Sequence, residues 1–193
     1  MTYSTISRQR SKTQHDIVVN PALQNIPEEY KYTNGGEGHP RERFLQATHS
    51  FIFPGQAEER TVWIFATETF LSLLISASLV YFDGTFRTVP NQFLQLFTCG
   101  FWCDDVKFVN CLYGLTTHKD KTTYDYIFKW IINFGATRVP PVLLQWKRTM
   151  SDQEKGLIPS IRDKLRPFLE ANGMAVCYYH FTAFVPTHVT DVG

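Results

Sequence analysis

The sequence predicts a mixed α/β (α+β) domain with one β-sheet and helices packed on it. From residue 79 onward the apolar runs follow the order strand, strand, strand, helix, strand, helix, strand. Three successive strands form a meander, and each helix-to-strand unit then adds a parallel strand. The chain has 193 residues, 44% of them apolar, which is enough to bury one core. We therefore expect a sheet that is antiparallel first and parallel afterwards.

Residues 1–43 are predicted to be a polar arm or linker, and residues 44–193 the folded domain. The first segment is polar and interrupted by proline and glycine. It has no apolar secretory signal, and the longest uncharged apolar stretch, 69–82, spans 14 residues. A membrane span needs about 18 to 20. We expect an intracellular protein, nuclear or cytoplasmic, with no membrane partner.

The domain is expected to open with a β-hairpin and a short helix as an N-terminal extension. Apolar runs at 51–53 and 61–65 flank the turn residues Pro54 and Gly55. Thr67 and Glu68 then begin a helix, which ends at 76–78.

The central strands follow. Leu79 to Phe82 is a continuous apolar run, as in a strand buried on both faces, and it ends in Asp83-Gly84-Thr85. The aromatic and β-branched runs 93–102 and 108–115 are separated by five residues, which predicts a hairpin.

Two helices and two strands complete the prediction. Thr122 to Asp125 has the pattern of a capping box, and Gly135 is placed just after the end of that helix. A strand is expected over 142–150, a helix over 153–171 and a last strand over 174–181. Pro159 either belongs to the first turn of its helix or kinks it.

Two aspartates follow predicted strands and could bind a metal ion. Asp83 ends the first central strand, and Asp152 ends the strand after the capped helix. If those strands are neighbours, the two carboxylates emerge side by side and can share Mg²⁺ or Mn²⁺. Alternatively, Asp83 is a turn residue and Asp152 a helix N-cap.

Cys177 and His180 are a second candidate pair of metal ligands. They are three residues apart on the last apolar run, but a structural zinc site needs four ligands. Both could equally be core residues. For Cys99, Cys103 and Cys111 we expect burial as small apolar side chains.

Charge excludes strong non-specific binding to nucleic acid by the chain as a whole, since the formal net charge is +1. Residues 138–166 nevertheless hold seven basic and three acidic side chains. This stretch is either a solvated helix face or a surface for DNA phosphates. The candidate phosphate contacts are Lys147, Arg148, Lys155, Arg162, Lys164 and Arg166.

An ordered set of short motifs resembles the catalytic core of Mutator-like element (MULE) transposases. The similarity runs from about residue 44 to residue 181. Its motifs are Asp83-Gly-Thr-Phe86, Arg87-Thr-Val-Pro90, Phe93-Leu-Gln-Leu-Phe97, Tyr113-Gly-Leu-Thr-Thr-His-Lys119, Thr123-Tyr124, Ser151-Asp152-Gln-Glu-Lys155 and Cys177-Tyr-Tyr-His180-Phe181. The resemblance implies an RNase H-like fold.

The resemblance also implies roles for single residues. Asp83 and Asp152 match the first two acids of the family's DDE metal-binding triad, with Mg²⁺ or Mn²⁺ as cofactor. Cys177 and His180 match its Cys-x-x-His motif. The family's third acid, a downstream Glu, has no counterpart before Gly193, and Asp191 does not replace it. The domain is thus expected to be incomplete at its C-terminus, without the family's zinc-finger region.

Complete relatives cut and join DNA with two metal ions. For this chain the expectation is a transposase-like domain that is inactive alone and contacts DNA weakly through phosphates; the resemblance also allows a homo-oligomer. The alternative is a domesticated or remnant domain that acts only as a nucleic-acid or protein interaction module.

Overall fold

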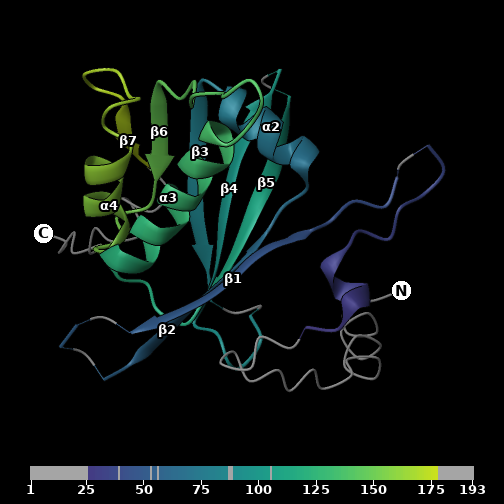
Figure 1. Cartoon of the computed structure of the whole chain (residues 1–193). Helices are drawn as coiled ribbons and strands as arrows, with labels where there is room; N and C mark the ends of the chain where they lie inside the picture. The colour runs from purple at the N-terminus through teal and green to yellow at the C-terminus, as the bar shows by residue number, and fades with distance from the viewer. Residues whose placement is uncertain are drawn as a thin grey trace, which may run out of the picture.

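A computed structural model of the chain describes residues 26–38, 40–52, 54–55, 57–86, 89–104 and 106–177 (Figure 1). Within these ranges a curved β-sheet is covered by α-helices. The elements in chain order are η2 (Glu28–Lys31), β1 (Leu45–Ile52), β2 (Glu59–Phe65), α2 (Glu68–Ser76), β3 (Leu79–Thr85), β4 (Gln95–Cys103), β5 (Lys107–Thr116), α3 (Lys121–Ala136), β6 (Arg148–Ser151), α4 (Leu157–Lys164) and β7 (Met174–Val176).

The strands form a single mixed sheet in the order β1-β2-β5-β4-β3-β6-β7. All neighbours from β1 to β3 are antiparallel, and β6 and β7 add to β3 in parallel. The prediction of a mixed sheet, antiparallel first and parallel afterwards, is confirmed. Strand β3 is the seam, since it pairs with β4 on one side and β6 on the other.

The expected N-terminal hairpin is present, and it belongs to the main sheet. β1 pairs with β2, and β2 continues the sheet by pairing Val62 with Thr116 of β5. The preceding segment also contacts the domain. Ile26 is buried, and Phe44 N donates to the carbonyl of Lys31 at 2.7 Å.

Helix α3 begins earlier than the capping-box prediction. Its N-cap is Asp120, whose side chain accepts a hydrogen bond from Thr123 N at 2.9 Å. The same carboxylate accepts from Arg60 Nε at 2.6 Å, which ties the cap to β2. Gly135 lies inside the last turn of the helix and not after it. A partner distant in sequence therefore decides where the helix starts.

The elements predicted after α3 are shorter than expected. Strand pairing covers only Arg148–Ser151, because residues 142–147 instead cross α2: Gln145 N donates to Ile75 O, and Trp146 Nε1 donates to Leu74 O at 2.7 Å. Helix α4 covers Leu157–Lys164, with Pro159 in its first turn, where no backbone donor is missed. The last strand ends at Val176, and residues 178–181 lie outside the described residues.

One core cluster joins the three described α-helices to the inner face of the sheet. It contains buried residues of α2, α3 and α4 together with Val80, Phe82 and Phe97. Phe82 is central, since its ring centroid lies 5.2 to 5.9 Å from those of Phe97, Phe128 and Trp146. A second cluster of Ile26, Leu45, Trp63 and Phe93 is separate from it. No described helix is long and apolar enough to cross a bilayer.

Gly135 should be required by a close backbone approach. A Cβ at this position would lie 2.4 Å from the carbonyl oxygen of Val142. We expect Gly135→Ala to destabilise the fold by about 1 to 3 kcal/mol, although alanine is the better helix former. Urea unfolding measures the change.

Gly114→Ala is the matched control, because a Cβ there meets its neighbours at an ordinary 3.5 Å. Equal stability of the Gly135 variant and wild type would contradict the close approach.

Candidate functional site

Three predicted site residues occupy the same register level on the neighbouring parallel strands β3, β6 and β7. Phe82 pairs with Ser151 and Ser151 with Val176, so one residue further along the chain come Asp83, Asp152 and Cys177. A backbone hydrogen bond confirms the alignment of Asp152 with Cys177, since Cys177 N donates to Ser151 O at 2.7 Å. In Figure 1, β3, β6 and β7 are drawn side by side at one side of the sheet. Adjacent strands are about 4.8 Å apart.

Asp83 lies within β3 and not after it, because the strand runs on to Thr85 and pairs Asp83 with Thr98. The strand does end in Asp83-Gly84-Thr85, as expected, but the alternative that Asp83 is a turn residue is wrong. The Asp83 side chain is exposed, and its Oδ1 accepts from Gly84 N at 2.8 Å. An exposed carboxylate is available to a ligand.

Asp152 directly follows β6 and is half-buried. The alternative that it caps the next helix is wrong, because α4 begins at Leu157 with Gly156 as its N-cap. The connection between them therefore carries Asp152 and Glu154 at the carboxyl end of β6 without engaging either as a helix cap.

A buried polar network lies against this edge of the sheet. The single proton of the Tyr124 hydroxyl is shared between Gln95 Oε1, 2.9 Å from the hydroxyl oxygen, and Glu154 Oε2. Gln95 Nε2 donates to the same Glu154 oxygen at 3.4 Å, and Lys119 Nζ lies 3.5 Å from Glu154 Oε1. Tyr124 and Gln95 are fully buried, and the Glu154 side chain is 9% exposed. A carboxylate two residues after Asp152 is thus held inside the protein.

Glycine at position 84 makes room for this network. A Cβ at Gly84 would lie 2.1 Å from Gln95 Nε2, which the network holds in place. The Asp83-Gly84 sequence therefore serves two purposes: the first residue presents a carboxylate, and the second admits a buried amide beneath it.

The pKa of Tyr124 lies well above its ordinary value. Burial is the main cause, followed by the hydrogen bond to Glu154 and the charge of Glu154. The charge of Asp152 raises this pKa further. The Asp152 carboxylate therefore acts electrostatically on the network, which couples the helix α3 hydroxyl to the candidate site.

The cysteines divide between core and surface. Cys177 is half-buried beside Asp152, and His180 lies outside the described residues. Cys99 and Cys111 are buried as expected, and burial raises the pKa of the Cys111 thiol to about 12. The expectation that Cys103 is buried is wrong: a register shift after Cys99 and the nearby turn leave it exposed.

The basic candidates do not form one patch beside the aspartates. Lys147 and Arg148 lie at the amino end of β6, whereas Asp152 follows its carboxyl end. Lys155 is exposed near Asp152, and Arg162 and Arg166 are exposed on and after α4.

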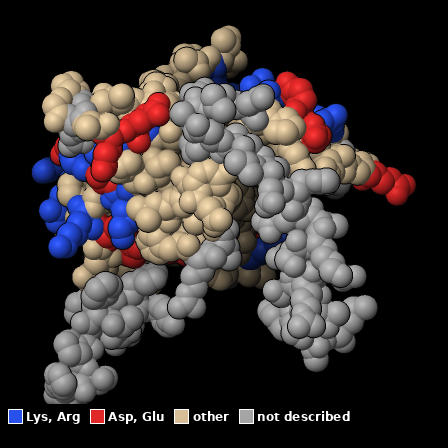
Figure 2. Space-filling view, turned by 90° about the horizontal axis from the view of Figure 1, so that it is seen from below, with Lys and Arg blue, Asp and Glu red and all other residues tan. Residues whose placement is uncertain are grey.

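Charges on α3 and α4 partly neutralise one another. Lys164 Nζ lies 3.5 Å from Asp125 Oδ2, and Lys121 Nζ lies 2.9 Å from Asp125 and 2.6 Å from Asp163. Figure 2 shows the molecule from below, with basic and acidic side chains intermixed on the side where Figure 1 has α4. The basic stretch is therefore in part a solvated, paired helix surface.

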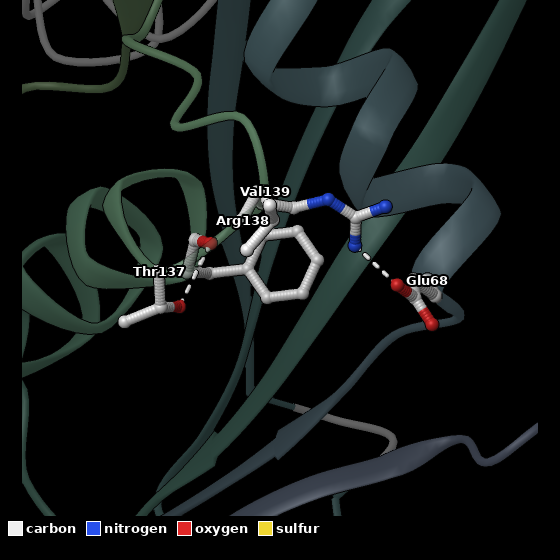
Figure 3. Close-up of a pocket in the computed structure, with 5 residues that line it drawn as sticks. Glu68, Thr137, Arg138 and Val139 are labelled. Atoms are coloured by element: carbon white, nitrogen blue, oxygen red, sulfur yellow. Dashed lines mark hydrogen bonds and ion pairs between the residues drawn. The ribbon is translucent and has the colours of Figure 1, made fainter.

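Two surface hollows are lined by residues other than the aspartates. One of about 330 Å³ is lined by Glu68, Phe134, Thr137, Arg138 and Val139, at the end of α3 (Figure 3). There Arg138 pairs with Glu68 and stacks over Phe134, its guanidinium carbon 5.3 Å from the ring centroid. Among the described residues, no group of three or more His, Cys, Asp or Glu side chains is arranged to hold a metal ion. The two aspartates therefore lack a third His, Cys, Asp or Glu ligand among the described residues.

Sequence reasoning missed Gln95, Tyr124 and Glu154 as members of one network. A signal existed for Gln95, because strand alternation places it on the same inward face as Phe97 and Cys99, where a polar residue needs a partner. No local pattern could have identified Tyr124 as that partner.

In comparisons with known proteins, no family model, no curated protein and no solved structure matches the chain.

Tyr124→Phe should destabilise the fold by about 1 to 3 kcal/mol, because the buried Gln95 and Glu154 lose their shared donor. The effect has a pH signature. The pKa of Tyr124 is raised from 10.0, so its stabilising contribution is present below about pH 10 and declines as the pH rises further. Chemical denaturation at a series of pH values should show wild type losing stability faster than the variant in alkaline solution.

If the unfolding free energies of wild type and Tyr124→Phe change with pH in parallel, the assigned role of the Tyr124 hydroxyl is contradicted. Tyr126→Phe is the control, since burial also raises the pKa of Tyr126, but no bond to Glu154 is present.

Proposed function

We propose that this chain is a transposase-like domain of RNase H-like fold, related to Mutator-like elements, which binds one divalent cation and contacts DNA without cleaving it alone. The observation that carries the proposal is the β3–β6 register, by which Asp83 and Asp152 occupy the same level of adjacent parallel strands. Two carboxylates on neighbouring strands are a natural pair of ligands for one hard cation.

The strand order supports the RNase H-like part of the proposal. The meander β3-β4-β5 is followed by two crossovers that add β6 and β7 on the other side of β3. This is the order expected from the transposase resemblance. The first strand of the meander is then central and carries the first acid, and the next strand added beside it carries the second.

The donor set fits Mg²⁺ or Mn²⁺. Asp83 and Asp152 offer carboxylate oxygens, which these ions prefer, and Asp83 is exposed. When bound, the ion would neutralise charge on a phosphodiester and activate a water molecule. The chain's own residues orient the site: Gly84 donates to Asp83, and the Gln95–Tyr124–Glu154 network supports the strand ends.

A calorimetric titration with Mn²⁺ tests the cation site. We expect Asp83→Asn and Asp152→Asn each to weaken binding by roughly tenfold or more, because each variant removes one anionic ligand. Asp104→Asn is the matched control: it removes an acid at the β4–β5 turn, where φ is 51° and asparagine is well tolerated.

Equal Mn²⁺ affinity in wild type and both site variants would reject the cation site. Plasmid DNA incubated with wild type and Mn²⁺ should stay intact. Cleavage that Asp83→Asn abolishes would show that a further acid completes the site.

DNA binding should be weak, insensitive to sequence and strongly dependent on salt. Few phosphates can be neutralised, and each contact contributes about 0.9 to the slope of log affinity against log salt. Lys147→Glu with Arg148→Glu should lower both affinity and slope, as measured by fluorescence anisotropy of a labelled duplex. Lys107→Glu with Lys129→Glu changes the net charge equally at exposed sites outside the basic stretch.

If the two double variants behave alike, the basic stretch makes no specific phosphate contact. Tight, salt-resistant binding to one sequence would contradict the proposal as well.

A second candidate function is a protein interaction module. Trp102 and Phe108 are exposed, and their ring centroids are 5.6 Å apart; Tyr81 meets Phe108 at 5.7 Å. Exposed aromatic side chains grouped in this way are typical of contact surfaces. Failure of both the Mn²⁺ and the DNA experiments would favour this role.

A further inference from the structure

One lysine is anchored between the two segments that leave the aspartates. Lys119 lies between β5 and α3, and its ammonium is 3.5 Å from Glu154 Oε1 and 4.7 Å from the ring centroid of Phe86. Phe86 follows Asp83 by three residues, and Glu154 follows Asp152 by two. The ammonium is therefore fixed at the edge of the sheet that carries both aspartates.

The side chain keeps capacity for a ligand. Lys119 is 50% exposed, and its ammonium, which has three donors, forms one ion pair with Glu154 at 3.5 Å. Glu154 is itself held by Tyr124 and Gln95 through its other oxygen. This arrangement restrains the lysine before any ligand arrives, which reduces the entropy lost on binding.

Electrostatics indicates what the ligand is. Asp83, Asp152 and Glu154 make this edge acidic, so an approaching polyanion is repelled unless fixed cations offset the charge. We propose that Lys119 binds a phosphate oxygen of the DNA backbone next to the Asp83–Asp152 cation site. The inference rests on the proposed function and adds a residue that contacts the substrate.

Other basic side chains are less suited to this role. Lys147 and Arg148 lie at the opposite end of β6, and Lys164 is 25% exposed against 50% for Lys119. Lys155 is exposed near Asp152, but no hydrogen bond, ion pair or ring contact among the described residues restrains it. Lys119 combines nearness to the aspartates, two restraining contacts and exposure. Its partner Phe86 is 45% exposed and shields one side of the ammonium without neutralising it.

The test compares Lys119→Gln with Lys119→Arg and with Lys129→Gln, which removes the same charge from an exposed position on α3. Anisotropy titrations of a labelled duplex, with Ca²⁺ present, are run over a series of NaCl concentrations. We expect Lys119→Gln to lower affinity by roughly three- to tenfold and the salt slope by about 0.9. Lys119→Arg should retain most of both, and Lys129→Gln should leave them unchanged.

A purely structural role would lower the melting temperature of Lys119→Gln but leave the salt slope of the folded protein unchanged. That outcome would overturn the proposal, as would equal effects of the Lys119 and Lys129 variants or no DNA binding by wild type at low salt. Should Lys119→Gln not fold, a lowered affinity and a lowered salt slope in Lys119→Met serve the same comparison.

The failure of the cation site is distinguishable from the failure of this inference. If Asp83→Asn leaves Mn²⁺ affinity unchanged while Lys119→Gln still lowers the salt slope, Lys119 is a phosphate contact on a surface without a metal role. If Mn²⁺ binding needs both aspartates but Lys119→Gln leaves DNA affinity and the salt slope unchanged, the cation site is supported and the phosphate contact of Lys119 is rejected.

Discussion

The parallel pairing of β3 with β6 is the constraint on which the candidate site depends. It sets Phe82 beside Ser151 and so carries Asp83 and Asp152 to one level of the sheet, although they are 69 positions apart in the chain. The pairing is stabilised from one side by the packing of Phe82 against Phe97, Phe128 and Trp146. A slip of one residue would turn these side chains away from the core, so burial protects the register.

At this edge of the sheet, a buried polar network lies next to the charged aspartates. On the inner face, Gly84 allows Gln95 to approach, and Gln95 shares Glu154 with Tyr124. The hydrogen bonds of Tyr124 and Gln95 to Glu154 Oε2 restrain the segment after β6, whereas Glu154 Oε1 forms an ion pair with Lys119 and no hydrogen bond among the described residues. Rigidity of the supporting groups is what a metal or phosphate site requires, because displaced ligands lose affinity. The core and the site are therefore built from the same contacts.

The sequence predicted the mixed sheet, the hairpin and the neighbouring aspartates because these follow from local patterns and from the handedness of crossovers. Prediction from the sequence failed where a contact with a residue distant in the chain sets the bounds of an element. Arg60 helps to fix Asp120 as the cap of α3, and the segment before Lys147 crosses α2 and does not pair as a strand. The role of Glu154 required Tyr124, 30 residues earlier, to be brought beside it. Such contacts have no signature in spacing or composition.

The central claim is that Asp83 and Asp152 share one cation, and anomalous diffraction from crystals soaked in Mn²⁺ tests it most directly. The account predicts one peak at the carboxyl end of β3 and β6, with oxygens of both aspartates at about 2.0 to 2.6 Å. A peak bound by only one of them, or a peak at another part of the surface with none between these strands, would contradict it.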